Sequence, residues 1–259
     1  MNIFQAAFLG LIQGLTEFLP ISSSGHLVLA EKIMGVHTGV SFGIALHIAT
    51  LIAIFIFFRK DIWEMLKKPF GKIPLLIVAG TIPTIIVAVV FKDIIKQAFS
   101  SGNTIGVEFI ITGLIILYVS TRSGKKEIED IKYSDAAVIG LAQGIAIMPA
   151  ISRSGLTLAA GIFRGMKKEA AIRYSFLLSI PAILGSAVFD AKDLLDGMTD
   201  SISTVPLIFG IIAAGLSGYF AIRVMLEVFS KKSLKPFAFY TLILGSLIIL
   251  DQTVIHLFF

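Results

Sequence analysis

Apolar stretches recur about every 30 residues along this 259-residue chain, and each is long enough to form a membrane-spanning helix. At about 1.5 Å per residue, a helix of about 20 residues crosses a hydrocarbon core of about 30 Å. Apolar residues make up 56% of the chain and charged residues only 15%, which is not the composition of a soluble domain. We therefore predict an all-α integral membrane protein in which residues 1–259 form a single membrane domain. The six predicted transmembrane helices are 40–58, 73–91, 105–121, 173–189, 205–229 and 237–257.

The chain also contains an internal repeat, whose second copy begins in the middle of the sequence. When residues 6–25 are placed on residues 136–155 without a gap, ten of the twenty positions are identical. Chance would give roughly one or two identities in so apolar a chain. We therefore predict two repeats, residues 1–121 and residues 134–257. The identical pairs are Ala6/Ala136, Ala7/Ala137, Gly10/Gly140, Leu11/Leu141, Gln13/Gln143, Gly14/Gly144, Ile21/Ile151, Ser22/Ser152, Ser24/Ser154 and Gly25/Gly155.

The two copies differ at the positions where reactive side chains occur. The first copy contributes an acid and an imidazole, and the second contributes a guanidinium group. Two similar scaffolds with complementary charges predict one site that both copies share. The differing pairs are Glu17/Ile147, Ser23/Arg153 and His26/Leu156.

The first stretch of each copy, residues 3–30 and residues 134–163, is predicted to form a re-entrant hairpin. Each consists of a moderately apolar helix, a break rich in Pro, Ser and Gly, and a short apolar second arm. The second arms, about 25–34 and 156–163, are too short to cross a bilayer. A broken backbone is tolerated at membrane depth only where protein or a wet cavity satisfies its polar groups, so we expect such surroundings for both breaks. The glycines of Gly10-x-x-x-Gly14 and Gly140-x-x-x-Gly144 are expected to allow close helix contacts.

Lys and Arg residues are concentrated in a set of short loops, and these loops indicate how the chain is oriented in the membrane. If both hairpins return to the side on which they begin, every basic loop is cytoplasmic, as the positive-inside rule requires. Each half then has one hairpin and three crossings, so the second half is inverted and the site is expected near the interface of the repeats, inside the membrane. The net charge of +5 thus reflects topology rather than nucleic-acid binding, and the acidic loop 190–200 is expected to be a solvated outer loop. The basic loops are 59–72, 122–132, 164–173 and 231–235.

The first break carries a cluster of reactive groups. Gln13 and Glu17 are four residues apart and share one face of a helix. A carboxylate inside a membrane arm usually marks a function or a buried structural pair. Pro20 ends the helix, and a hydroxyl-rich turn then leads to His26. Such a set of acid, hydroxyls and imidazole can supply a nucleophile and a proton carrier.

The second break has the composition of an anion-binding turn. Ser and Gly at a helix start leave backbone N–H groups free, and Arg153 offers a planar fork for phosphate oxygens. The alternative is a capped turn in which Arg153 forms a structural salt bridge with Glu17, and both interpretations can hold in the empty state. Glu108 and His47 lie in predicted spanning helices and are interpreted as packing partners; for Glu108 the alternative is a place at the border of the site. The sequence contains no Walker loop, HExxH motif or zinc pattern, and its lack of cysteine excludes disulfides.

The segments QGLTEFLPISSSGH and PAISRSGLT resemble the two signature motifs of the bacitracin-resistance type undecaprenyl-diphosphate phosphatase family. The similarity extends over essentially the whole chain in length, segment order and motif spacing. It implies a membrane pyrophosphatase that removes the terminal phosphate of undecaprenyl diphosphate, regenerates the lipid carrier for cell-wall synthesis and confers bacitracin resistance. It also implies a divalent cation, Mg²⁺ or Ca²⁺, and a multi-pass protein of the plasma (inner) membrane with an active site on the outer side.

The resemblance further implies roles for individual residues. Gln13 and Glu17 match the family's Glu/Gln-x-x-x-Glu element, and Ser23 and His26 match its proposed nucleophile and acid/base residues. Two positions depart from the family pattern, because Gln13 stands where many members have Glu and Ala150 stands where the motif usually has Gly. The predicted catalytic residues are Glu17, Ser23, His26 and Arg153. The predicted phosphate-binding residues are Gln13, Ser22, Ser152, Arg153, Ser154 and Thr157, and the predicted metal ligand is Glu17.

The predicted reaction is attack on the terminal phosphorus by Ser23, by His26 or by an activated water, while the cation and Arg153 stabilise the developing charge. The expected partners are a polyprenyl diphosphate and membrane lipids, without nucleic acid, and a homodimer is left open. Inverted repeats and broken helices are also typical of secondary transporters, so a transporter or flippase for a lipid phosphate or other anion is the alternative. A purely structural subunit is a third interpretation.

Overall fold

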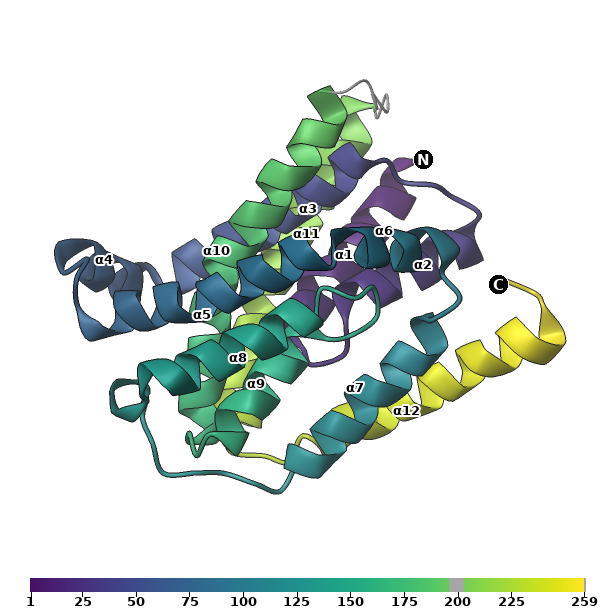
Figure 1. The fold of residues 1–259 in the computed structure, drawn as a ribbon. Helices are drawn as coiled ribbons and strands as arrows, with labels where there is room; N and C mark the ends of the chain where they lie inside the picture. Colours follow the sequence, from purple (N-terminus) through teal and green to yellow (C-terminus); the bar gives the residue numbers. More distant parts are fainter. Residues whose placement is uncertain (196–202, 259) are drawn as a thin grey trace.

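The computed structural model describes residues 1–195 and 203–258, and no β-strand forms among them (Figure 1). Short 3₁₀ or π turns occur at Ile128–Asp130, Met225–Phe229 and Asp251–Ile255. Residues 190–195 of the predicted acidic loop instead form the end of the helix Lys168–Leu195, and residues 196–200 lie outside the described residues. The helices are α1 (Ile3–Phe18), α2 (Ser23–Met34), α3 (Val40–Phe57), α4 (Arg59–Lys67), α5 (Lys72–Val90), α6 (Lys92–Ser101), α7 (Ile105–Val119), α8 (Tyr133–Ile145), α9 (Arg153–Phe163), α10 (Lys168–Leu195), α11 (Thr204–Val224) and α12 (Lys235–Leu250).

Five helical segments are long and apolar enough to cross a membrane. The all-α class and the multi-pass membrane character predicted from the sequence are therefore confirmed. The stretch predicted as a third span, residues 105–121, forms α7, which has only 15 residues and covers about 22 Å. The five segments are Val40–Phe57, Lys72–Val90, Lys168–Val188, Thr204–Phe229 and Lys235–Ile255.

The two stretches predicted as hairpins form pairs of short, touching helices, α1 with α2 and α8 with α9. α1 ends at Phe18, and the next residues include Pro20, which has no N–H to continue the helix. The second arms start slightly earlier than predicted because a serine caps each of them. Ser22 accepts a hydrogen bond from Gly25 N–H at the start of α2, and Ser152 accepts the equivalent bond from Gly155 N–H at the start of α9.

All four basic loops lie at one end of the molecule, along the left and lower sides in Figure 1. The α8–α9 hairpin also returns to this end, since Asp135 near its start forms an ion pair with Arg164 after its second arm. Lys32, after the second arm of the α1–α2 hairpin, instead donates to the carbonyl of Phe258 near the C-terminus, which lies away from the basic loops in Figure 1. The contacts that join the basic loops are Arg173 with Asp61, Lys168 with the carbonyl of Lys232, Lys167 with Glu127, and Lys72 with the carbonyl of Glu129.

Each hairpin packs its first arm on a helix from the other half of the chain, α1 on α11 and α8 on α5. The contacts are close because glycines face each other. A Cβ atom added at Gly10 would lie 2.2 Å from the carbonyl oxygen of Gly210, and one at Gly140 would lie 1.8 Å from that of Gly80. Gly10 and Gly140 occupy equivalent positions in the two repeats, as do Gly80 and Gly210. The predicted role of the glycine pairs in close helix contact is confirmed.

Replacing Gly140 with alanine is expected to force α8 away from α5, because the new Cβ would meet a backbone oxygen that cannot rotate away. We expect a loss of about 1–3 kcal/mol in the free energy of unfolding, the usual cost of overpacking. Thermal unfolding in detergent measures it. The control is Gly185→Ala in α10, where no heavy atom lies within 4 Å of the added Cβ. Equal melting temperatures for the two variants would contradict the close contact.

Asp135 connects the start of α8 to the basic loops through hydrogen bonds and ion pairs. The buried carboxylate accepts hydrogen bonds from Lys132 N–H (3.0 Å), Lys126 Nζ (3.1 Å) and Arg164 Nε (2.7 Å). Burial alone would raise the pKa of Asp135, but the hydrogen bonds from the backbone, Arg164 and Lys126 outweigh it and lower the pKa to about 2.

Asp135→Asn is expected to cost about 2 kcal/mol of stability at neutral pH, because a folded-state pKa of about 2 lies below the unfolded value near 4. This contribution of the carboxylate is fully present above pH about 4 and is lost as the pH falls towards 2. The gap in melting temperature between the two proteins should therefore be constant from pH 5 to pH 8 and shrink below pH 4. A gap that does not change with pH would contradict this origin.

Candidate active site

The tips of the two hairpins meet inside the molecule. Hydroxyl groups of each tip donate to carbonyl oxygens of the other: Ser22 Oγ lies 3.4 Å from the carbonyl of Pro149, and Ser24 donates to the same oxygen. In the reverse direction, Ser154 Oγ donates to the carbonyl of Leu19 at 2.9 Å. These three contacts join the two breaks directly.

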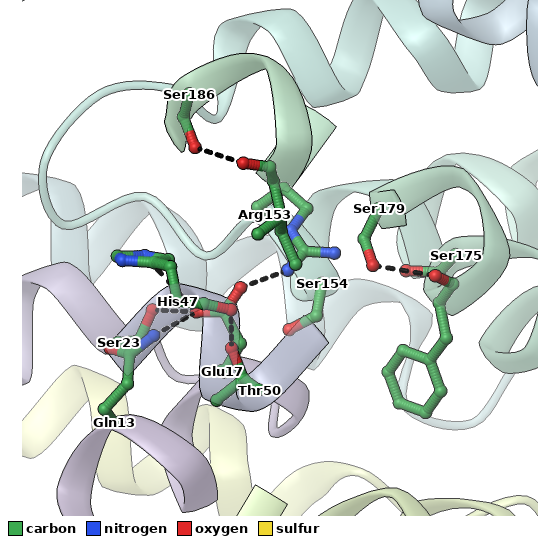
Figure 2. A network of polar contacts seen from close by, with 12 residues as sticks. Gln13, Glu17, Ser23, His47, Thr50, Arg153, Ser154, Ser175, Ser179 and Ser186 are labelled. Carbon is green, nitrogen blue, oxygen red and sulfur yellow. Dashed lines mark hydrogen bonds and ion pairs between the residues drawn. The ribbon is translucent and has the colours of Figure 1, made fainter. Parts of the chain in front are cut away.

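Glu17 lies at the centre of this junction and is buried (Figure 2). Its Oε2 atom accepts hydrogen bonds from Ser23 Oγ at 2.6 Å and from Gln13 Nε2 at 3.1 Å. Its Oε1 atom forms an ion pair with the guanidinium group of Arg153. Four residues that the sequence analysis placed in one site, from three different helices, therefore do lie together.

Arg153 has a hydrogen-bond donor that no described residue accepts. One terminal nitrogen, Nη2, binds Glu17, whereas Nη1 is buried and has no hydrogen-bond partner among the described residues. Arg153 also begins α9, so its own N–H and that of Ser154 point out of the helix start without helical partners. A free guanidinium nitrogen beside a helix N-terminus is an arrangement that binds a phosphate group.

His47 is a member of the site that the sequence interpretation treated as a packing residue. It extends from α3, and its Nδ1–H donates to the carbonyl of Gly43 at 2.9 Å. The other ring nitrogen, Nε2, lies 3.9 Å from Glu17 Oε2; it is an acceptor in the neutral ring and forms an ion pair with Glu17 in the protonated ring. The side chain is 32% exposed. A lone histidine in an apolar helix gives no sequence signal for such a position.

His26 lies apart from this cluster although it is close in sequence. Its Nδ1–H donates to the carbonyl of Ser22 at 2.6 Å, and its Nε2 lies 2.7 Å from the hydroxyl of Tyr240 in α12. The ring stacks on Tyr240 and meets the edge of Phe109. Both ring nitrogens are therefore engaged away from Glu17.

The remaining predicted phosphate-binding residues shape the turns. Ser152 accepts the capping bond from Gly155 N–H at 3.1 Å, and its hydroxyl lies 3.3 Å from that of Ser154. Thr157 donates to the carbonyl of Arg153 at 2.8 Å and contacts Ser175 Oγ of α10 at 2.5 Å, so its hydroxyl faces α10.

The two tips differ in backbone conformation. Ser22 has φ = 71°, in the left-handed region that non-glycine residues seldom adopt, and such strain is common at functional sites. Ala150, which stands where the family motif usually has glycine, is not among the described residues with positive φ. Its Cβ is accommodated because Gly25 opposite has none; a Cβ there would lie 3.0 Å away.

The described residues contain no group of three or more His, Cys, Asp or Glu side chains that could bind a metal ion. Besides Glu17, the junction contains an amide oxygen without a partner among the described residues and a histidine ring nitrogen. Gln13 Oε1 is buried and has no hydrogen-bond partner within the described structure, and His47 Nε2 faces the carboxylate. A carboxylate that accepts a serine hydroxyl beside an arginine with a free donor is suited to phosphoryl transfer.

Comparisons with known proteins agree with this chemistry. The profile of the family described as "Bacitracin resistance protein BacA" matches residues 6–247. An "Undecaprenyl-diphosphatase" from Carboxydothermus hydrogenoformans is 51% identical over 256 residues, covering 97% of this chain and 98% of that protein. "Undecaprenyl-diphosphatase 4" from Bacillus thuringiensis (strain Al Hakam) is 44% identical over 97% of this chain and 98% of its own length. An "Undecaprenyl-diphosphatase" from Halothermothrix orenii is 43% identical over 96% and 98%.

Proposed function

The chain belongs to the bacitracin resistance protein BacA family. We propose that its phosphatase reaction takes place where the two hairpin tips meet. The protein is an undecaprenyl-diphosphatase, which hydrolyses undecaprenyl diphosphate to undecaprenyl phosphate and inorganic phosphate and so recycles the lipid carrier for cell-wall synthesis. The observation that carries the proposed location is the contact of Glu17 with both Ser23 and Arg153, the latter with a free buried nitrogen.

In the proposed reaction, Arg153 Nη1 and the first N–H groups of α9 hold the oxygens of the terminal phosphate. Ser23 Oγ, or a water molecule in its place, attacks the terminal phosphorus while Glu17 Oε2 takes the proton from the attacking hydroxyl. The new P–O bond forms as the bond to the bridging oxygen breaks, and that oxygen leaves with undecaprenyl phosphate. A phosphoserine, where formed, is hydrolysed by water. The engaged nitrogens of His26 favour Ser23 or water over His26 as the nucleophile.

We further propose that a divalent cation, Mg²⁺ or Ca²⁺, binds at Glu17, with Gln13 Oε1 and His47 Nε2 beside it. Hard cations prefer oxygen ligands, and the unpartnered amide oxygen of Gln13 fits that preference. When bound, the cation would supply charge neutralisation at the phosphoryl oxygens. Because Gln13 is uncharged, the site has one carboxylate where the family pattern implied by the motif resemblance often has two, and we expect it to bind the cation more weakly.

The proposed topology has six spans and two re-entrant hairpins in inverted repeats. Its support is the gathering of the basic loops at one end, which the positive-inside rule places in the cytoplasm. The α1–α2 hairpin then opens to the outer side, and so does the site. α7 is short, but its flanks reach both ends: Gly102 bonds to Gln252 near the C-terminus, and Gly124 bonds to Met166 among the basic loops.

Whether the reaction needs a divalent cation is tested by measuring release of inorganic phosphate from undecaprenyl diphosphate by the purified protein in detergent. We expect release that a chelator stops and that added Mg²⁺ or Ca²⁺ restores. Release that continues unchanged in chelator would overturn the cation at Glu17. A lipid transporter, the alternative left by the sequence, would instead show uptake into vesicles that survives Arg153→Ala.

A further inference from the structure

The second hairpin tip depends on α7 for two of its backbone hydrogen bonds. Between α8 and α9, four N–H groups bond to carbonyls within the hairpin, and Pro149 has no N–H. The two that remain are the N–H groups of Ala150 and Ser152, which are three residues and one residue before Arg153. The bonds within the hairpin are Ala146 to Ala142 (3.0 Å), Ile147 to Gly144 (3.2 Å), Met148 to Ile145 (3.4 Å) and Ile151 to Met148 (3.3 Å).

Two side chains of α7 accept these remaining N–H groups. Glu108 Oε2 accepts from Ala150 N–H at 2.7 Å, and Thr112 Oγ1 accepts from Ser152 N–H at 3.1 Å. Thr112 Oγ1 also lies 3.4 Å from the carbonyl of Ala150. Glu108 and Thr112 are four residues apart and therefore project from the same face of α7. Both are buried, so water cannot replace either acceptor.

The first tip has no such support from the equivalent helix. The alignment of the two repeats places Ala238 opposite Glu108 and Leu242 opposite Thr112 on α12, and neither side chain can accept a hydrogen bond. At that tip Ser22 adopts a left-handed conformation instead. If these acceptors only met a requirement common to broken helices, both tips would need them. Of the two tips, only the one that carries Arg153 has them.

We propose that Glu108 is a positioning residue for phosphate binding, which together with Thr112 holds the turn before Arg153 in place. A fixed turn sets where the Arg153 guanidinium group and the first N–H groups of α9 point. This inference rests on the proposed function and assigns to that site a residue from a third region of the chain, outside both motifs.

The chemistry of Glu108 provides a conservative variant. Only Oε2 is bonded; Oε1 is buried without a hydrogen-bond partner among the described residues. Glu108→Gln can keep the bond from Ala150 N–H through its amide oxygen, whereas Glu108→Ala leaves that N–H without an acceptor. A positioning role therefore predicts that Gln, but not Ala, preserves phosphate binding. Thr112→Val is a second variant that removes the neighbouring acceptor should Glu108→Ala fail to fold.

The test compares kcat and KM for undecaprenyl diphosphate, together with the dissociation constant of inorganic phosphate, among the variants. We expect Glu108→Ala to raise KM and the phosphate dissociation constant at least tenfold, Thr112→Val to raise both by a smaller factor, and Glu108→Gln to stay within threefold of wild type. The control is Tyr174→Phe, which removes a buried hydrogen bond to the carbonyl of Leu76 (2.8 Å) between α10 and α5. It should lower the melting temperature without changing either constant.

Two results would overturn the inference. One is unchanged phosphate binding in folded Glu108→Ala and Thr112→Val. The other is an equal loss in Glu108→Gln and Glu108→Ala, which would point to charge rather than position. Phosphate binding needs no turnover, so it decides the role of Glu108 even in a preparation that releases no phosphate. Absence of release by folded wild-type protein would instead count against the proposed function.

Discussion

Arg153→Ala is expected to lower kcat/KM for undecaprenyl diphosphate by about 10³-fold or more. Arg153 is the cationic side chain in contact with Glu17 at the tips, and its free Nη1 is the donor that we assign to the terminal phosphate. Arginines that stabilise a transferring phosphoryl group are worth about 10³–10⁵ in rate. Arg153→Lys keeps the charge but not the planar fork, so we expect it to recover only part of the loss.

The control for Arg153→Ala addresses stability. Removing the guanidinium group leaves Glu17 as a buried charge without its arginine partner, and breaking such a buried pair typically costs about 3–5 kcal/mol. The double variant Arg153→Ala with Glu17→Gln removes that charge and should regain much of the melting temperature without regaining phosphate release. Steady-state phosphate release and thermal unfolding are measured on the same preparations. Near-normal kcat/KM in Arg153→Ala would show that the ion pair is only structural.

Glu17→Gln is expected to lower kcat by about 10²–10⁴-fold, the usual contribution of a positioned general base. The amide can still accept a hydrogen bond from Ser23, but it cannot take up the proton of the attacking hydroxyl. The Glu17→Gln change also removes the negative charge that we propose as the ligand of the cation. Binding of Mn²⁺ as a substitute ion, followed by electron paramagnetic resonance, should therefore weaken together with phosphate release.

Glu31→Gln in α2 is the matched control for Glu17→Gln. Glu31 is a carboxylate of the same hairpin whose partner is the hydroxyl of Thr38, away from the tips. We expect this variant to retain wild-type phosphate release and Mn²⁺ binding. If Glu17→Gln behaved like Glu31→Gln, Glu17 would be neither the base nor the cation ligand.

Much of the fold follows from local sequence patterns. Apolar length predicts the spanning helices, and Pro20 with the serines that follow predicts the first break. The repeat reveals that Glu17 and Arg153 belong to equivalent tips, and their opposite charges indicate that the tips meet. The glycines at positions 10 and 140 predict close helix contacts because a missing Cβ permits them. These properties depend on residues that are adjacent in sequence or related by the repeat.

The parts of the site that the sequence does not reveal depend on the direction of side chains across helices. His47 belongs to a different helix from Glu17, and Glu108 lies far from Ala150 along the chain, so no periodicity links either residue to its partner. His26 shows the converse. It falls within ten residues of Glu17 in sequence, yet the turn at Ser22 directs its ring towards Tyr240. Proximity in sequence across a broken helix does not fix which way a side chain points.

The most direct test of the proposed site follows oxygen isotopes in a single turnover of wild-type protein in H₂¹⁸O. If the terminal phosphate is held between the hairpin tips, water or Ser23 attacks the terminal phosphorus, and the bridging oxygen stays with the lipid. The heavy oxygen should then appear in inorganic phosphate, with none in undecaprenyl phosphate, whether or not a phosphoserine forms. Heavy oxygen in undecaprenyl phosphate, with unlabelled inorganic phosphate, would mean attack on the inner phosphorus and would contradict the placement of the terminal phosphate at Arg153.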